Sequence, residues 1–198
     1  MADSTEIHVW DQHALDVWAT NPTGHVCEGQ PLRLELLKLK DEVVTTLDLG
    51  CGLALWHKLF EGFEYIGVDQ SPEMLSCARK LCPTGKFIQA NAEATGLKPE
   101  SIDLVFTAAV LQHNKHARKS DVVAEIVRIL KPGGYYLCTE CTFRPDNFQP
   151  IFPGKPFSED LTDGYSFTAT GWAKFMAERG LELVWHKGSG EYLYRKQA

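Results

Sequence analysis

The sequence predicts an α/β fold: a seven-stranded, doubly wound sheet, mostly parallel, with helices on both faces and an antiparallel C-terminal hairpin. Two observations lead to this prediction. From residue 43 onward, short strand-like runs alternate with segments of helical period, and such alternation builds βαβ units with right-handed crossovers. Near the end of the chain, the runs 181–186 and 191–195 are separated by a glycine-containing turn, which predicts the hairpin.

The remaining elements follow in order along the chain. Besides the hairpin, strands are expected at 43–49, 64–68, 86–89, 102–107 and 134–141. Helices are expected at 10–20, 31–40, 54–61, 72–81, 119–130 and 171–179, so that two helices precede the first strand. The connection 142–168 is rich in proline and phenylalanine and has no helical or alternating period, so a long, ordered loop is expected there.

Composition limits the classes of function. Lysine plus arginine number 20 against 26 aspartates plus glutamates, a net charge of −6 that disfavours nucleic acid as the main partner. The first six residues are polar and acidic, and no apolar stretch approaches the roughly 20 residues that span a bilayer. We therefore expect a cytoplasmic protein with no membrane partner.

The six cysteines are expected to be free thiols, because a chain of this length needs no disulfide staples. Cys138 and Cys141 have the C-x-x-C spacing found in metal sites. They end a predicted strand, however, and no second cysteine or histidine pair follows at zinc spacing. No metal site is expected.

The glycine turn after the first predicted strand carries the strongest local signal. Residues 45–54 read Thr-Thr-Leu-Asp-Leu-Gly-Cys-Gly-Leu-Ala, and Gly50 and Gly52 allow the backbone to approach a ligand without a Cβ in the way. A dinucleotide fingerprint would need glycine at position 55, where the chain has leucine. The shorter turn suits a ribose and an amino-acid tail, whose ammonium Asp48 could hold directly or through water. A purely structural turn is the alternative.

A carboxylate ends the second predicted strand. Asp69 follows Gly50 by 19 residues, and an acid at this offset in a doubly wound sheet can accept hydrogen bonds from the two hydroxyls of a ribose. The alternative is that Asp69 caps the helix beginning at Pro72, a role for which Ser71 is better placed. Together, the turn and the acid favour a cofactor that contains a nucleoside.

Five segments resemble the motifs of class I S-adenosylmethionine-dependent methyltransferases, and most closely the small type 11 group. They are Asp48–Ala54, Tyr65–Leu75, Ala90–Glu93, Ser101–Thr107 with Val110–His113, and Ile129–Gly134. The chain departs from the family pattern at Ala54, where a third glycine is usual, and at Asn91, where aspartate is frequent. The resemblance implies a Rossmann-like sheet and the cofactor S-adenosyl-L-methionine, with S-adenosyl-L-homocysteine as product.

The resemblance also implies the roles of individual segments. The glycine turn would border the methionine tail of the cofactor, Asp69 would bind the ribose, and the segment after the third strand would reach the adenine. The expected cofactor contacts are Asp48, Gly50, Cys51, Gly52, Asp69, Gln70, Met74, Asn91, Ala92, Glu93, Thr107, Ala108 and Gln112. One domain would comprise a helical lid (1–42), the cofactor-binding core (43–141), a substrate-loop insertion (142–170) and a final helix with hairpin (171–198).

The acceptor side is less defined. A hydroxyl nucleophile would want a general base, whereas an amine or thiol needs only positioning. His113, behind the fourth strand, is the first candidate base and His13 the second; a surface or capping role is the alternative for each. Trp10, Trp18 and Phe143 lie outside the motifs and are expected to contact the acceptor, although such aromatic residues also pack cores.

The sequence thus predicts a methyltransferase that acts on an O, N or S atom of a small-molecule acceptor. Enzymes that methylate amino groups of nucleic acids resemble one another in an Asn/Asp-Pro-Pro-Tyr segment, where this chain has Thr107-Ala-Ala-Val110. Two alternatives stay open. One is a methyltransferase acting on tRNA or protein, and the other is a non-catalytic partner subunit that binds S-adenosylmethionine.

Overall fold

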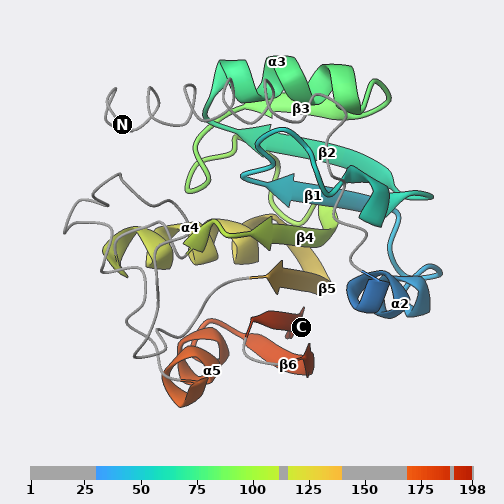
Figure 1. The fold of residues 1–198 in the computed structure, drawn as a ribbon. Coiled ribbons are helices and arrows are strands. Elements are labelled where there is room, and N and C mark those ends of the chain that lie inside the picture. Colours follow the sequence, from blue (N-terminus) through green and yellow to red (C-terminus); the bar gives the residue numbers. More distant parts are fainter. Residues whose placement is uncertain (1–29, 112–115, 140–168, 188–189, 198) are drawn as a thin grey trace, which may run out of the picture.

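The structure, a computed structural model, describes residues 30–111, 116–139, 169–187 and 190–197. Within these ranges it contains one seven-stranded sheet of order β3-β2-β1-β4-β5-β7-β6 (Figure 1). All neighbouring strands pair in parallel except β7, which pairs antiparallel with both β5 and β6. The predicted α/β fold with an antiparallel C-terminal hairpin is therefore confirmed.

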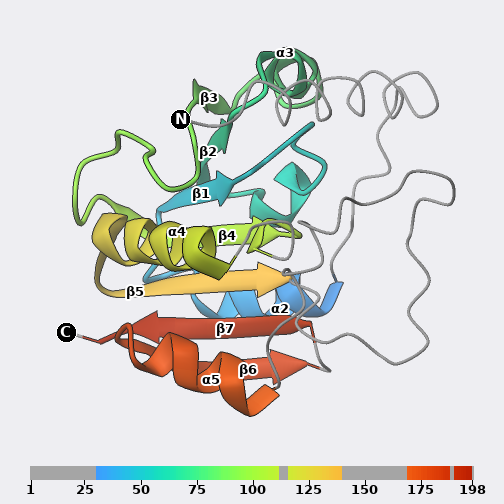
Figure 2. The same ribbon diagram turned by 90° about the vertical axis from the view of Figure 1, so that its left-hand side faces the viewer.

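The strands have the following bounds: β1 Thr45–Leu49, β2 Glu64–Asp69, β3 Lys86–Gln89, β4 Ile102–Ala108, β5 Leu130–Thr139, β6 Leu181–Lys187 and β7 Glu191–Lys196. The helices are α2 Gln30–Lys38, α3 Pro72–Leu81, α4 His116–Ile129 and α5 Ala169–Ala177, with a 3₁₀ helix, η1, at His57–Phe60. Figure 2 shows α4 and α5 in front of the sheet and α2 behind it. The predicted helix 10–20 and the predicted loop 142–168 lie outside the described residues.

Two apolar clusters fill the two faces of the sheet. On one face, Val122 and Ile126 of α4 and Trp172 of α5 pack against strand residues such as Tyr136. On the other face, Leu36 of α2 belongs to the second cluster, whose further members include Leu32, Phe60, Tyr65, Phe106, Leu137 and Leu193. Because side chains alternate along a strand, β2, β4 and β5 contribute to both clusters, as expected for a sheet covered on both sides.

The helix predicted at 54–61 is wrong. Turns occupy this segment up to η1, and their backbone bonds span three residues, as from Ala54 N to Cys51 O (2.8 Å) and from Leu59 N to Trp56 O (2.8 Å). The cause is local: Gly52 and Ala54 have left-handed φ angles of 51° and 59°, which an α-helix cannot contain. The longer turn brings Leu53, Leu55 and Trp56 to the end of the sheet.

Strand β5 begins four residues earlier than predicted. Ile102 of β4 pairs with Leu130, but Leu104 pairs with Tyr135, so the register shifts between these two positions. Gly133, with φ of 75°, lies inside this bulge. A bulge leaves extra residues in one strand, and it explains why the proline and glycines at 132–134 did not mark the strand's beginning.

Candidate functional site

A cavity of about 180 Å³ opens at the carboxyl ends of β1 and β4. These two strands are where the strand order reverses, the place at which open α/β sheets bind ligands. The cavity is lined by Asp48, Gly50, Cys51, Gly52, Leu53, Leu55, Trp56, Met74 and Ala108. Six of these nine residues are predicted cofactor contacts: Asp48, Gly50, Cys51, Gly52, Met74 and Ala108.

The glycine turn forms one wall of the cavity. The Gly50 and Cys51 N–H groups both donate to the carbonyl oxygen of Val68, at 2.7 Å and 3.0 Å, which ties the turn to the end of β2. Gly50 has a φ of 73°, and a Cβ there would lie 2.5 Å from Cγ2 of Val110. The backbone of the turn therefore borders the cavity directly, and position 50 needs glycine because of its positive φ and the nearby Val110 side chain.

Asp48 is the buried carboxylate of the site. It is 1% exposed, and its Oδ2 accepts a hydrogen bond of 2.6 Å from the Tyr65 hydroxyl of the adjacent strand. Burial raises the pKa of Asp48 to about 7; the bond from Tyr65 opposes this shift, and the negative charge of Asp69 adds to it. A cation entering the cavity would stabilise the ionised form of this carboxyl.

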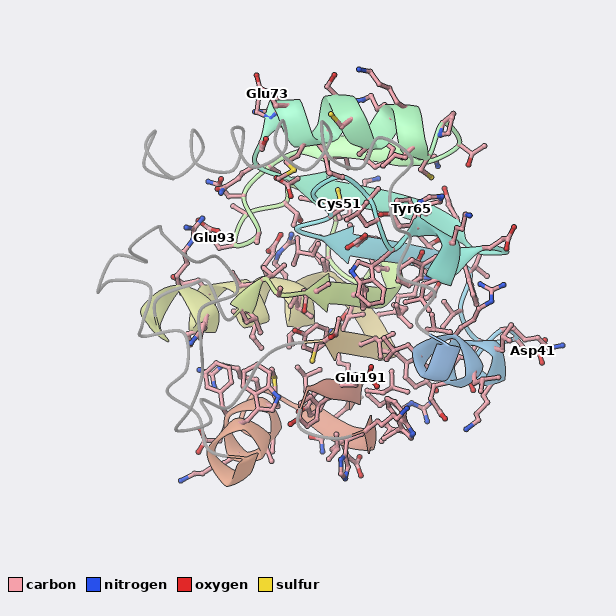
Figure 3. The ribbon with its side chains drawn as sticks, in the orientation of Figure 1. Asp41, Cys51, Tyr65, Glu73, Glu93 and Glu191 are labelled. Carbon is pink, nitrogen blue, oxygen red and sulfur yellow. The ribbon has the colours of Figure 1, made fainter. Side chains whose placement is uncertain are left out.

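Figure 3 labels Tyr65 and the neighbouring cavity residue Cys51 between β1 and β2. The Cys51 thiol is buried, and a Cβ on Gly67 of β2 would lie 2.8 Å from its sulfur, so the small residue in β2 makes room for it. Burial, together with the charges of Asp48 and Asp69, raises the pKa of this thiol well above its ordinary value. Cys51 is therefore a protonated, packing side chain and not a nucleophile.

Asp69 lies beside the glycine turn. Its Oδ2 accepts from the Gly52 N–H (2.8 Å) and its Oδ1 from the Ser71 N–H (2.9 Å). Ser71 is the N-cap of α3, since its Oγ accepts from the Met74 N–H (3.0 Å). The capping role considered for Asp69 thus belongs to Ser71, and the Asp69 carboxylate is held at the carboxyl end of β2, where a ribose is expected.

Gln70 follows Asp69 and carries an unusual feature. Its side-chain Oε1 is buried and makes no hydrogen bond with any described residue. A buried polar atom without a partner is costly, and at a ligand site it is typical of a group that awaits a hydrogen-bond donor. The Gln70 amide therefore fits a ligand with hydroxyl or amino groups next to Asp69.

The segment after β3 does not reach the cavity. Asn91, Ala92 and Glu93 are absent from its lining, and the carboxylate of Glu93 is 3.3 Å from Nε of Arg118 on α4. Figure 3 shows Glu93 to the left of the strands, beyond their carboxyl ends. The roles of these three residues at the adenine therefore stay predictions, and Glu93 is ion-paired with Arg118.

Thr107 is oriented away from the cavity, although its neighbour Ala108 lines it. The Thr107 hydroxyl lies 2.8 Å from the Tyr136 hydroxyl, on the face of the sheet that α4 and α5 cover. The alternation of side chains along β4 explains this, because adjacent residues point to opposite faces. Thr107 and Ala108 were both predicted to contact the cofactor, but only Ala108 points to the side of the cavity.

Three lining residues were not predicted. Leu53, Leu55 and Trp56 reach the cavity because the segment after the turn is not a helix. No local signal in the sequence predicted this, because alanine at position 54 disfavours the left-handed φ of 59° that it adopts. Trp56 also packs edge-on against Phe106, with ring centroids 5.5 Å apart.

Several predicted residues lie outside the described part of the chain: His13, His113, Gln112, Trp10, Trp18 and Phe143. In the described part, no cluster of three or more His, Cys, Asp or Glu side chains could hold a metal ion. The four cysteines described there, Cys51, Cys77, Cys82 and Cys138, are buried free thiols. Among the same residues, no helix combines the length and the apolar character that crossing a membrane requires.

The arrangement fits the methyl donor in three respects. Apolar walls from Leu53, Leu55 and Trp56 suit a thioether or sulfonium chain, and the adjacent buried carboxylate suits an ammonium. The carboxylate of Asp69 and the amide oxygen of Gln70 follow on the side of β2. The cavity is smaller than the roughly 300 to 1,000 Å³ typical of ligand sites, so the described residues enclose one part of such a ligand.

Comparison with known proteins finds a methyltransferase domain in the chain. Residues 47–138 match the methyltransferase domain of the type 11 group. The chain is 30% identical over 132 residues to a 2-methyl-6-phytyl-1,4-hydroquinone methyltransferase of Synechocystis, an alignment of 63% of the chain and 41% of that relative. It is 36% identical over 99 residues to a trans-aconitate 2-methyltransferase of Azoarcus, covering 48% of the chain and 38% of that relative.

The fold is also that of a solved structure, the Burkholderia thailandensis 1,6-didemethyltoxoflavin-N1-methyltransferase with bound 1,6-didemethyltoxoflavin and S-adenosylhomocysteine. The TM-score is 0.67 at 17% identity, over 100% of this chain and 92% of the other. The chain spans about two fifths of the length of these two sequence relatives. Residues 47–138 thus carry a methyltransferase domain, and the chain has the fold of a solved methyltransferase with bound S-adenosylhomocysteine.

Proposed function

We propose that this protein transfers the methyl group of S-adenosylmethionine to an O, N or S atom of a small-molecule acceptor. The observation that carries the proposal is the cavity at the ends of β1 and β4, where the glycine turn, a buried carboxylate and apolar walls meet. Asp69 adds a second carboxylate beside the turn. The match to the methyltransferase domain supports the same assignment.

Each wall of the cavity has a role in this proposal. Asp48 would pair with the ammonium of the cofactor's methionine part, and the backbone of Gly50 and Gly52 would lie against its chain. Asp69 would accept hydrogen bonds from the ribose hydroxyls, and Gln70 would accept one from the ribose or adenine. Met74 and Trp56 would exclude water from the sulfur.

When bound, S-adenosylmethionine supplies a methyl group on a positively charged sulfur, which is already a strong electrophile. The residues of the chain then have to hold the acceptor in line with that methyl and keep water out, a contribution of about 7 to 11 kcal/mol in favourable cases. A hydroxyl acceptor would also need a base. His113, and after it His13, are proposed for this role, since His113 follows β4 and Ala108 of β4 lines the cavity.

The acceptor is proposed to be a small molecule. The net charge of −6 disfavours a phosphate backbone, and two of the sequence relatives are named for a hydroquinone and for trans-aconitate, whereas another is named for tRNA. A tRNA or protein acceptor, or a partner subunit without activity, would give a different experimental result.

Methyl transfer itself is the test. The full chain is incubated with S-adenosylmethionine labelled in its methyl group and with three acceptor sets: a metabolite library, total tRNA and a protein extract. Label in one or more library compounds, lost in His113→Ala when the acceptor atom is a hydroxyl oxygen, supports the proposal. Label in tRNA or protein alone, or S-adenosylhomocysteine binding without any transfer, overturns it.

A further inference from the structure

The C-terminal hairpin carries a buried carboxylate oxygen that the cofactor site does not use. Glu191, labelled in Figure 3, is the first residue of β7. Its Oε2 is buried and accepts no hydrogen bond from the described residues. Lys187 lies opposite on β6 but is exposed, and no salt bridge within the described residues joins the two. A buried acceptor without a donor among the described residues is costly, and beside a ligand site it is typical of a group that binds a donor of the ligand.

The pairing of the strands connects Glu191 to the cavity. Ala108, which lines the cavity, pairs with Thr139 of β5, and Thr139 pairs with Glu191. The three residues therefore form one row across the carboxyl edge of the sheet. With neighbouring strands about 4.8 Å apart, the row places the Cα of Glu191 about 10 Å from that of Ala108.

The three side chains of this row share a face. Leu193, two residues after Glu191, belongs to the apolar cluster that contains Phe106 and Leu137. The intervening Tyr192 belongs to the cluster on the other face. Residues two apart in a strand point to the same side, so Glu191 and Ala108 are both on the face that carries Trp56 and the cavity.

We infer that Glu191 is a specificity-determining residue of the acceptor site and accepts a hydrogen bond from an amino or hydroxyl group of the methyl acceptor. The inference rests on the proposed function, because it takes the cavity wall at Ala108 as the methyl-donor side. A small acceptor would extend along the row from Ala108 toward Glu191. Acceptors that present a carboxylate to this position are repelled by it.

Three probes that share one ring test this assignment: benzylamine, benzyl alcohol and benzoate. Their binding to the full chain, saturated with S-adenosylhomocysteine, is measured by ligand-observed NMR for the wild type, for Glu191→Gln and for the control Glu182→Gln. Glu182 is an exposed carboxylate near the opposite end of β6, so its variant removes the same charge away from the row. Thermal unfolding checks that all three proteins are folded.

We expect the wild type and Glu182→Gln to bind the amine and the alcohol better than benzoate. Glu191→Gln should weaken amine binding by about tenfold and narrow the difference from benzoate, with the Kd of S-adenosylhomocysteine unchanged. Equal binding of the probes to wild type and Glu191→Gln, or no binding of either donor probe to the wild type, overturns the inference. Failure to bind S-adenosylhomocysteine would instead overturn the proposed function.

Discussion

Replacing Asp48 by asparagine is predicted to stabilise the protein at high pH while weakening its cofactor binding. The carboxyl has a pKa of about 7 in the folded chain against an ordinary value of 3.8. Between these two pH values the folded state binds more protons than the unfolded state, so the free energy of unfolding falls as the pH rises. Asparagine removes this loss and keeps an oxygen that can accept from Tyr65.

The size of the effect follows from the pH difference. Between pH 5 and pH 7 the penalty of the buried carboxyl grows by about 3 kcal/mol, at 1.36 kcal/mol for each pH unit, and then stays constant. The free energy of unfolding of Asp48→Asn minus that of the wild type should therefore be about 3 kcal/mol higher at pH 8.5 than at pH 5, so the variant gains stability relative to the wild type. In a chain of this size this is a relative Tm gain of about 6 to 12 °C.

The assay is thermal and urea unfolding of both proteins at the two pH values, with calorimetric titration of S-adenosylhomocysteine at pH 8.5. Asp103→Asn is the matched control. Burial would raise the pKa of Asp103, but the hydrogen bonds from Lys131 and from the N–H groups of Thr45 and Val44 outweigh it and hold this pKa below its usual range. Asp103→Asn should destabilise at both pH values. A stability difference between Asp48→Asn and wild type that does not change with pH would refute the reasoning.

Substitutions at three other positions test the geometry of the site. Gly50→Ala should lower the free energy of unfolding by about 1 to 3 kcal/mol and abolish S-adenosylhomocysteine binding, because its Cβ would lie 2.5 Å from Val110 at a φ of 73°; unchanged affinity in calorimetry would contradict this. Thr107→Val should lower the free energy of unfolding in urea by about 1 kcal/mol, because the hydrogen bond with Tyr136 is lost, and it should change the Kd of S-adenosylhomocysteine by less than twofold. A tenfold higher Kd would place the Thr107 side chain in the site. Ala54→Val should lower the free energy of unfolding by more than about 2 kcal/mol and Ala54→Gly by less than about 1 kcal/mol, since a β-branched residue is strained at a φ of 59°. Equal melting temperatures of the two variants would contradict this expectation.

The sequence predicted the architecture because the α/β pattern is repeated along the chain. The strand predicted at 86–89 and the helix predicted at 72–81 match β3 and α3 residue for residue. Both have sharp local boundaries: Ser71 and Pro72 begin α3, and the helix ends before Cys82. Here, local chemistry and the tertiary fold agree.

The failures occur where the backbone is unusual. The segment after the glycine turn has the apolar spacing of a helix, but Gly52 and Ala54 have left-handed φ angles, which prevent an α-helix from forming there. Its apolar side chains, Leu53, Leu55 and Trp56, consequently line the cavity. The spacing of apolar residues indicates which residues are buried, but it does not indicate which part of the structure they pack against.

The residues of the candidate site that belong to the glycine turn and to the start of the next helix could be predicted from the sequence. Asp48, the two glycines and Met74 follow from the turn and the start of α3, so their placement at the cavity was accessible from motif and spacing. The orientation of Thr107 depends on the alternation along β4, and the pairing of Glu93 with Arg118 depends on a contact between distant segments. Glu191 has no local motif, and its place beside Thr139 follows only from the antiparallel pairing of β7.

Calorimetric titration of S-adenosylhomocysteine into the wild type and into Asp69→Asn tests the central claim, that this sheet edge holds the methyl donor. Asparagine keeps an oxygen for the Gly52 N–H and removes the charge expected at the ribose. We predict one binding site per wild-type chain and a Kd at least tenfold higher for Asp69→Asn. No binding to the wild type, or equal Kd values for the two proteins, would contradict the account.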